Sequence, residues 1–222
     1  MSGGTERART SGSRDFRERL CVRAQRAGVE VADDELNQLE VYFTLLAKWN
    51  ARINLTALPL NPPTDETVDR LIVEALAAAR YFPKSHVMWF DLGSGNGSPA
   101  LPLKMIRPAA ALTMIEARAR RVAFLREVVS VIGLRNATVA NGRFEALADR
   151  YSKTAGFVTV RAVKIDAALA QAAAHLAAPE GRLLLFRSDP NSVIVPGFET
   201  IETVELVPDR RSYLSVYRYV GG

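Results

Sequence analysis

The feature that most constrains this chain is a short apolar run that leads into closely spaced glycines and then into a helical pattern. Residues 87–92 predict a buried strand, and the following segment Gly93–Gly97 allows the positive φ values and close backbone approach that glycine tolerates best. Ser98 followed by Pro99 is typical of a helix that begins with a capping residue and a proline in its first turn. A strand, a glycine turn and a helix N-terminus in this order predict a ligand-binding site.

An acidic residue marks the end of the next predicted strand. Glu116 lies about 20 residues beyond the glycine turn, where an acid holds the two ribose hydroxyls in nucleotide-binding folds. This predicts a cofactor that contains a nucleoside. The glycines stand at every second position after Asp91, whereas dinucleotide sites have the spacing G-x-G-x-x-G, so NAD is disfavoured. The alternative is that the glycines only form a tight turn between a strand and a helix.

The chain after residue 83 alternates short β-rich runs with helical patterns, which predicts βαβ units around a mainly parallel sheet. The expected strands are 87–92, 111–116, 137–140, 155–160 and 181–187, and the expected helices lie near 98–107, 117–133, 143–149 and 164–177. Residues 201–207 and 213–220 predict two further strands joined by a tight turn, and therefore an antiparallel hairpin. The sequence thus predicts an α/β fold.

Three helices are expected before the first strand. They cover residues 14–26, a segment that begins at Asp33 or Asp34, and a segment that begins at Thr64 or Asp65 and runs to Ala79. Residues 1–12 lack apolar periodicity and are expected to be disordered, with Ser13 able to cap the first helix. We therefore divide the chain into a basic tail (1–12), a helical extension (13–82) and a sheet domain (83–222), the last two forming one compact unit.

Composition excludes several classes of protein. Cys21 is the only cysteine, so an internal disulfide is impossible, and the two histidines, His86 and His175, lack the spacing of metal ligands. No apolar run approaches the roughly 18 residues of a membrane span, and we expect a cytoplasmic protein. The net charge of +5 is concentrated in residues 1–26, which hold seven arginines and three acids. Such an arm predicts contact with nucleic acid, or else a solvated tail.

Motifs on both sides of the glycine turn resemble those of one family. They are Trp49-Asn50-x-x-Ile53-Asn54-Leu55-Thr56 before the turn, Phe90-Asp91-Leu92-Gly93-Ser94-Gly95 at the turn, and Arg120-Arg121-Val122-x-Phe124-Leu125-Arg126 and Arg143-x-Glu145 after it. The family is that of the bacterial 16S rRNA guanine-N7 methyltransferases called GidB or RsmG, and the resemblance covers roughly residues 14–220. It implies a class I, Rossmann-like methyltransferase fold that uses S-adenosylmethionine and acts on the 530-loop region of the small ribosomal subunit.

The resemblance, together with the glycine turn, assigns residues to the cofactor. They are Asp91, Gly93, Ser94, Gly95, Gly97, Ser98, Glu116, Ala117, Phe144, Glu145 and Arg161. Guanine N7 carries a lone pair and no proton, so methyl transfer needs alignment rather than a general base. Arg161 is expected at the ligand edge of the sheet, on the methionine carboxylate, guanine O6 or a phosphate, or in a surface ion pair. Asn54 is a second candidate for catalysis, or else a turn-capping residue.

Arginines close to the cofactor turn are the candidates for RNA contact, with a solvated helix face as the alternative. They are Arg118, Arg120, Arg121, Arg126, Arg143 and Arg187. The expected partner is 16S rRNA or the 30S subunit, bound by a monomer without a metal. The chain departs from the family at Leu71, where a histidine is usual, at Ser98, and at Arg187, so the target base stays open. Alternatives are a methyltransferase of a small molecule or protein, and a non-catalytic RNA-binding relative.

Overall fold

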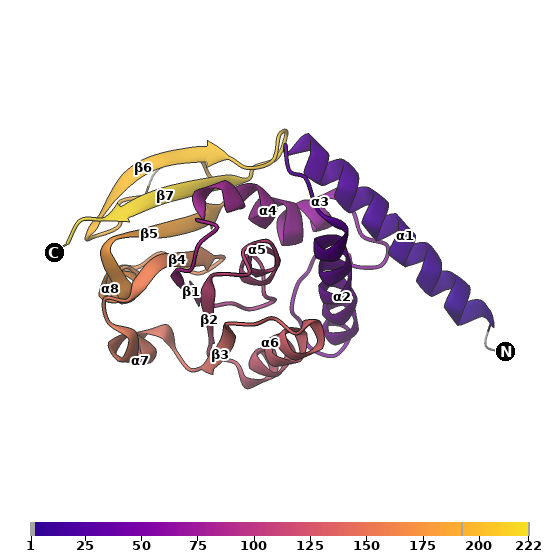
Figure 1. Cartoon of the computed structure of the whole chain (residues 1–222), viewed down its shortest axis with the longest axis horizontal. Helices are drawn as coiled ribbons and strands as arrows, with labels where there is room; N and C mark the ends of the chain where they lie inside the picture. The colour runs from indigo at the N-terminus through magenta and orange to yellow at the C-terminus, as the bar shows by residue number, and fades with distance from the viewer. Residues whose placement is uncertain (1–2, 192, 222) are drawn as a thin grey trace.

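The computed structural model describes residues 3–191 and 193–221, and it places a helical extension against a seven-stranded sheet (Figure 1). The extension consists of α1 (Gly3–Arg26), α2 (Asp33–Asn50) and a composite helix made of α3 (Asp65–Val68), η1 (Asp69–Val73), α4 (Glu74–Ala78) and η2 (Ala79–Tyr81). Thr64 caps the composite helix, because its hydroxyl accepts a hydrogen bond from the backbone N–H of Thr67. The three predicted helices are therefore present.

The first helix begins earlier than expected. We expected disorder over residues 1–12 and a start at Ser13, whereas α1 begins at Gly3, and only residues 1 and 2 of that stretch lie outside the described residues. Phe16, Leu20 and Ala24 anchor the second half of α1 in the core. Once such an anchored segment has formed, each further residue adds a helical hydrogen bond without a new nucleation cost. This explains how a stretch of low apolar content continues the helix.

The sheet has the strand order β3-β2-β1-β4-β5-β7-β6. Its strands are β1 (Met88–Leu92), β2 (Ala111–Glu116), β3 (Ala137–Asn141), β4 (Ala155–Arg161), β5 (Ala177–Arg187), β6 (Phe198–Glu205) and β7 (Tyr213–Tyr219). The first five strands pair in parallel, and β7 pairs antiparallel with both β5 and β6. The predicted parallel sheet and C-terminal antiparallel hairpin are confirmed, and β5 differs from its predicted range by beginning at Ala177.

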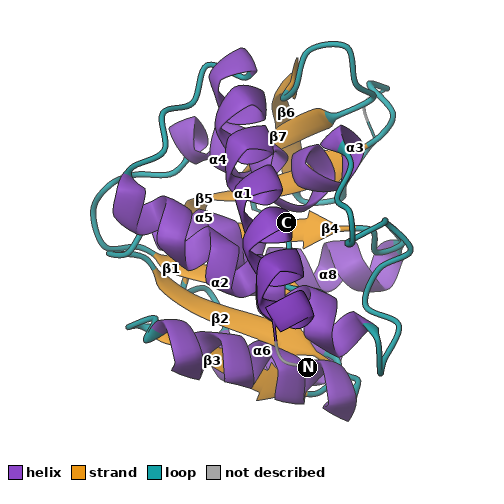
Figure 2. Ribbon diagram, turned by 90° about the vertical axis from the view of Figure 1, so that its right-hand side faces the viewer, coloured by secondary structure: helices purple, strands orange, loops and turns teal. Residues whose placement is uncertain are grey.

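The helices between the strands are α5 (Ala100–Ile106), α6 (Ala119–Ile132), α7 (Phe144–Ala148), η3 (Asp149–Tyr151) and α8 (Ala167–Leu176). The extension packs with α5 and α6 on one face of the sheet, and α8 covers the other face (Figures 1 and 2). Along β1, Trp89 belongs to the first core while Phe90 and Leu92 belong to the second. This alternation follows from the two-residue period of a strand and gives both faces a buried side.

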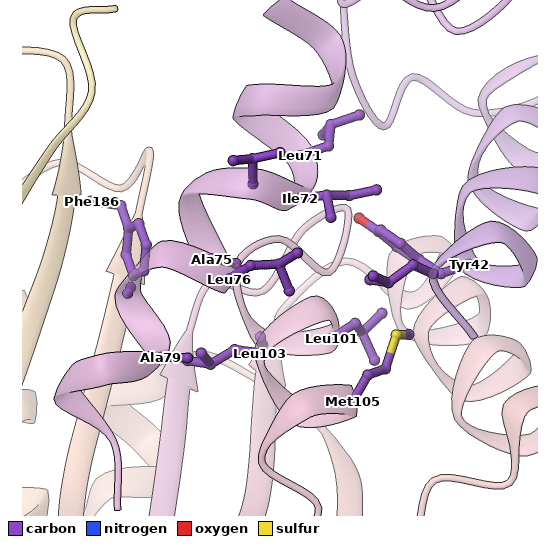
Figure 3. Close-up of a cluster of buried hydrophobic side chains, with 14 of the residues drawn as sticks. Tyr42, Leu71, Ile72, Ala75, Leu76, Ala79, Leu101, Leu103, Met105 and Phe186 are labelled. Atoms are coloured by element: carbon purple, nitrogen blue, oxygen red, sulfur yellow. The ribbon is translucent and has the colours of Figure 1, made fainter. Parts of the chain in front are cut away.

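The composite helix is buried between the sheet, α2 and α5. Its apolar side chains, among them Leu71, Ile72 and Leu76, pack against Tyr42 of α2 and Met105 of α5 (Figure 3). Within this helix η1 is a π-turn, in which the N–H of Glu74 donates to the carbonyl of Asp69. A π-turn leaves the carbonyl of the next residue, Arg70, without its usual helical donor. This local defect lies next to the site described below.

Candidate cofactor and substrate site

Two neighbouring strands of the sheet, β1 and β4, carry the site at their carboxyl ends. After β1 the chain continues to β2 and β3 on one side, whereas β4 and β5 lie on the other, so the sheet reverses its direction of growth between β1 and β4. Ligands of open α/β sheets bind at such a reversal. Asp91 lies near the end of β1, and Arg161 is the last residue of β4. Both residues therefore lie at this edge of the sheet.

The glycine turn leaves β1 in a conformation that requires glycine. Gly93, Gly95 and Gly97 have φ values of 75°, 51° and 88°. A Cβ atom on Gly93 would lie 2.7 Å from Val163, and one on Gly97 would lie 2.3 Å from a Leu101 methyl carbon. A larger residue at Gly93 or Gly97 would therefore force its neighbours to move, while a Cβ on Gly95 would make ordinary contacts of 3.6 Å with Arg121 and with the carbonyl of Gly93.

Glu116, the last residue of β2, contacts this turn. Its Oε2 accepts a hydrogen bond of 2.9 Å from the backbone N–H of Gly95, and its Oε1 accepts one of 2.8 Å from the N–H of Arg118. Each bond joins an ionised acceptor to a backbone donor, which is a charge-assisted type. Glu116 thus lies beside the glycine turn, and its predicted contact with a ribose stays a prediction.

Asp91 is the second acid of the site and is 1% exposed. Its Oδ1 accepts a 2.6 Å hydrogen bond from the Thr159 hydroxyl, which in turn accepts one from Trp89 Nε1. Burial raises the pKa of Asp91 to about 6, hydrogen bonds from Ser94 and Thr159 oppose the rise, and the negative charge of Glu116 adds to it. A cation placed between the two acids would offset the cost of ionising the buried Asp91 and the repulsion between the two carboxylates.

These features fit S-adenosylmethionine, which carries a sulfonium, an ammonium and a ribose. A pair of buried acids suits the two positive charges, and the glycine turn lets the backbone approach a ligand closely. Of the other predicted cofactor residues, Ser94 donates its hydroxyl to the carbonyl of Asp91, and Phe144 is half-buried against the core that α8 covers. Ala117 and Glu145 are exposed.

Ser98 does not cap helix α5, although the sequence predicted that it would. Helix α5 begins at Ala100, its N-cap is Pro99, and no side chain caps it. The Ser98 hydroxyl instead accepts a 2.8 Å hydrogen bond from Arg161 and donates one of 3.4 Å to the carbonyl of Arg70. The π-turn explains this difference, because it leaves that carbonyl available to the hydroxyl.

Arg161 is held by a cluster of groups from the composite helix. Its guanidinium forms an ion pair with Glu74, donates to the Arg70 carbonyl and to Ser98, and lies 4.9 Å from the centre of the Phe186 ring. Burial, followed by the charge of Arg70, lowers the pKa of Arg161 to about 9, which still leaves it a cation at neutral pH. The expected surface ion pair is thus a buried one, and its partner, Glu74, is 2% exposed.

A pocket of about 350 Å³ opens beside this cluster, and we call it the Glu74 pocket. Its walls come from the composite helix, the glycine turn and the end of β5. They are Leu58, Glu66, Arg70, Leu71, Glu74, Asn96, Ser98, Arg161, Ala162, Phe186, Arg187 and Ser188. Sequence reasoning missed Glu74 and Arg70 as site residues, although Glu74 is a lone charge within the apolar run 71–79. Tyr42 was also missed, and its hydroxyl donates to the carbonyl of Asn96.

Comparison with known proteins assigns the chain to a family. The sequence model of rRNA small subunit methyltransferase G matches residues 35–193. The chain belongs to this family. The protein of that name from Halorhodospira halophila is 34% identical over 161 residues, which are 72% of this chain and 73% of that protein. The one from Lactococcus lactis subsp. cremoris is 32% identical over 164 residues, which are 72% and 68% of the two chains.

Solved structures confirm the class I methyltransferase fold of this member of the rRNA small subunit methyltransferase G family. The mitomycin 7-O-methyltransferase MmcR is similar with a TM-score of 0.55 and 17% identity, over 69% of this chain and 55% of that one. TrmN from Thermus thermophilus is similar with a TM-score of 0.52 and 17% identity, over 66% and 49%. The predicted family, fold class and S-adenosylmethionine-dependent enzyme class are therefore confirmed.

The remaining predicted residues of this methyltransferase lie around the two sites. Arg118, Arg120, Arg126 and Arg143 are exposed, and Arg121 is half-buried, with its NH1 atom 3.6 Å from the position of a Cβ on Gly95. Arg187 lines the Glu74 pocket and donates to the carbonyl of Asn191. Arg118 and Arg121 thus lie beside the glycine turn and Glu116, and Arg187 lies at the pocket.

Asn54 does not cap the turn of the Trp49–Thr56 motif. Asn50 does so, since its side-chain oxygen accepts from the N–H groups of Leu55 and Thr56. Asn54 is exposed, and its carbonyl accepts a 3.5 Å hydrogen bond from Arg121. The motif therefore places Asn54 near the cofactor turn through its backbone.

Several arginines of the basic arm are bonded within the protein. Arg17 pairs with Glu40, Arg19 with Asp65, and Arg23 with the buried Asp69. These contacts reduce the charge that the arm offers to a nucleic acid. In the part of the chain that the structure describes, no helix is long and apolar enough to cross a membrane, and no group of three or more His, Cys, Asp or Glu is placed to hold a metal ion.

Proposed function

We propose that this protein transfers the methyl group of S-adenosylmethionine to N7 of a guanine in 16S rRNA. The match to the family over residues 35–193 carries the proposal, because the name of the family and of its relatives specifies the RNA of the small ribosomal subunit. The site supports it, because Asp91, Glu116 and the glycine turn lie beside a pocket at the same edge of the sheet. The compartment of this substrate in bacteria is the cytoplasm.

The cofactor is held by residues that the chain places around the glycine turn. Glu116 is positioned to accept hydrogen bonds from the ribose hydroxyls, and Asp91 to balance the ammonium of the methionine part. Arg121 of α6 lies beside Gly95 and would border the bound cofactor. When bound, S-adenosylmethionine would supply an electrophilic methyl group.

Methyl transfer to guanine N7 requires the protein mainly to align the base with the methyl group. Guanine N7 attacks through a lone pair, so no proton leaves the base in the methyl-transfer step. Binding therefore has to hold N7 in line with the methyl group and to exclude water. Asn96 and Ser98 belong both to the glycine turn and to the wall of the pocket, so the two binding sites share one loop. This shared wall brings the donor and the acceptor together.

RNA contact is proposed for the exposed arginines near the turn and at the pocket. Those with exposed side chains are Arg118, Arg120, Arg126 and Arg143. Each phosphate that they neutralise releases counterions, so affinity should fall with salt. We further propose that the enzyme is a monomer, with the helical extension 13–82 and the sheet domain 83–222 acting as one unit, because the largest core includes residues of both.

The experiment is to incubate the protein with methyl-labelled S-adenosylmethionine and 30S subunits or 16S rRNA that lack the modification, and then to map the labelled base. We expect a single labelled guanine, transfer that survives a chelator, and a kcat without a bell-shaped pH profile near neutrality. Glu116→Gln tests the cofactor site, and Glu199→Gln, in an exposed ion pair with Arg218, is the matched control.

Three results would redirect the proposal. Label on a base atom that must lose a proton would remove the N7 assignment. Binding of 30S subunits without transfer would favour a non-catalytic RNA-binding relative. Cofactor turnover with a small molecule or protein, together with weak and salt-insensitive binding of rRNA, would favour a different methyltransferase on the same fold.

A further inference from the structure

The Glu74 pocket is lined by a buried carboxylate that forming the helix does not require. Glu74 is 2% exposed within the otherwise apolar run 71–79, and it lines the pocket. A buried carboxylate is unfavourable unless it is paired, and here two guanidinium groups pair with it. Arg70 lies 3.2 Å from Oε1, and Arg161 contacts Oε2. Both guanidinium groups line the same pocket as the carboxylate that they compensate.

The carboxylate retains capacity for a ligand. An ionised carboxylate has about four acceptor positions on its two oxygens, and the two arginines occupy one on each oxygen. Arg70 is also incompletely used, because its side chain is 30% exposed and the bond to Glu74 takes one of its five N–H donors. From one end to the other the pocket therefore offers a donor followed by two adjacent acceptors.

This order matches one nucleobase. The Watson–Crick edge of guanine presents an acceptor at O6, then a donor at N1 and another at the 2-amino group. Adenine, cytosine and uracil each offer at most one donor next to an acceptor, so none of them satisfies both carboxylate oxygens. Flipped bases are read through hydrogen bonds to this edge and through packing against flat or apolar side chains. Leu58, Leu71 and Phe186 supply such walls here.

We infer that the Glu74 pocket binds the guanine base, with Glu74 accepting hydrogen bonds from N1–H and the 2-amino group and Arg70 donating to O6. The inference rests on the proposed function for the identity of the reaction, and adds the residues that select the base. The volume of about 350 Å³ is at the small end of ligand sites, as a single nucleoside requires. Arg161 holds Glu74 in place and is a positioning residue.

A pocket for a phosphate group is the main competing interpretation, because three arginines line the cavity. Two acids, Glu66 and Glu74, line it as well, and the more buried of the two is Glu74. Both carboxylates would repel a phosphate, whereas the guanine edge needs one of them. The observations therefore favour a base over a phosphate in the depth of the pocket.

The test is binding of free nucleotides, which does not depend on turnover. The full chain, saturated with S-adenosylhomocysteine, is titrated by saturation-transfer NMR with guanosine, inosine and 1-methylguanosine 5′-monophosphates. Inosine lacks the 2-amino group and 1-methylguanosine lacks N1–H. Since a hydrogen bond to a charged group corresponds to about tenfold or more in affinity, guanosine monophosphate should bind about ten times more tightly than either analogue. Equal affinities, or no binding of guanosine monophosphate, would overturn the inference.

Glu74→Gln is the matching variant, because it keeps the shape of the side chain and replaces one acceptor by a donor. The preference for guanosine over inosine monophosphate should fall to within about threefold, while affinity for S-adenosylhomocysteine stays the same. Glu199→Gln, which also removes a carboxylate from an arginine, should keep the wild-type preference. An unchanged preference in Glu74→Gln would show that Glu74 serves only to hold Arg161. Should this variant fail to fold, the analogue series on the wild-type protein still decides.

The outcome separates this inference from the proposed function. Discrimination among the nucleotides without labelling of rRNA would support the guanine pocket and contradict the rRNA substrate. Labelling of a guanine in 16S rRNA without discrimination among the free nucleotides would support the proposed function and overturn the role of Glu74. Competition by inorganic phosphate that removes all nucleotides equally would indicate a phosphate site and also overturn it.

Discussion

Asp91→Asn should make the ligand-free protein more stable while it weakens cofactor binding. Asp91 is 1% exposed, and the pKa of its carboxyl rises from its ordinary 3.8 to about 6, first because burial opposes the charged form. At 1.36 kcal/mol per pKa unit, this shift corresponds to about 3 kcal/mol of unfolding free energy lost when the folded protein has to ionise Asp91. Asparagine keeps an oxygen that accepts from the Thr159 hydroxyl and carries no charge.

The effect should depend on pH with a definite sign. Because the pKa in the folded state lies above that in the unfolded state, the folded protein keeps the proton between about pH 4 and pH 6 while the unfolded chain loses it. The stability contributed by Asp91 is thus complete below about pH 4 and lost as the pH rises through about 6. Wild type and Asp91→Asn should match at the acid end, and the variant should lead by up to about 3 kcal/mol above pH 6.

Urea unfolding of both ligand-free proteins from about pH 4.5 to 7.5 measures this difference, with Glu199→Gln as a surface control. Calorimetric titration with S-adenosylmethionine should show affinity lowered by about tenfold or more in Asp91→Asn, since the ammonium loses its charged acceptor. Wild-type affinity should itself decline below about pH 6, as Asp91 takes up a proton. A constant gap in stability across the pH range, or a less stable variant at pH 7.5, would refute the reasoning.

Three further results are expected. Glu116→Ala should weaken binding of S-adenosylmethionine in calorimetry by about 10- to 100-fold, because charge-assisted hydrogen bonds are lost, and unchanged affinity would remove Glu116 from the cofactor site. Arg161→Ala should lower the free energy of unfolding in urea by about 3 to 5 kcal/mol, because it leaves Glu74 buried and unpaired, and a loss below about 1 kcal/mol would contradict the ion pair. Deletion of residues 1–26 should lower the melting temperature strongly, whereas deletion of 1–12 should have a smaller effect, because only the longer deletion removes the buried Phe16, Leu20 and Ala24; equal effects would contradict this division.

The parts of the fold that the sequence predicted are those that depend on local patterns. Short β-rich runs between helical patterns located the strands, and the hydroxyl of Thr64 marked the start of the composite helix. Gly93 and Gly97 indicated the turn, because their positive φ values and close contacts admit no other residue. These signals work because each depends on the residue itself and on its immediate neighbours in the chain.

The parts that the sequence did not predict depend on partners that are distant in the chain. Arg161 and Glu74 are 87 positions apart, and nothing in either local pattern pairs them. Ser98 has the sequence context of a cap, yet its hydroxyl turns to Arg161 and to a carbonyl that the π-turn leaves available. In the same way, Arg19 and Arg23 look like free charges in a basic arm until the structure brings Asp65 and Asp69 beside them.

Asp69 bonds to two arginines that are made at very different times during synthesis of the chain. Its buried carboxylate accepts hydrogen bonds from Arg23 of α1 and from Arg210 in the turn between β6 and β7. Arg210 follows Asp69 by 141 residues, and at roughly 5 to 20 residues per second it is made about 7 to 30 s later. During that interval the helix that forms one wall of the Glu74 pocket holds a carboxylate that lacks its last partner. The buried charge of Asp69 should therefore be fully compensated only after the final hairpin has formed, so a protein truncated before that hairpin would keep an incompletely paired carboxylate in this helix.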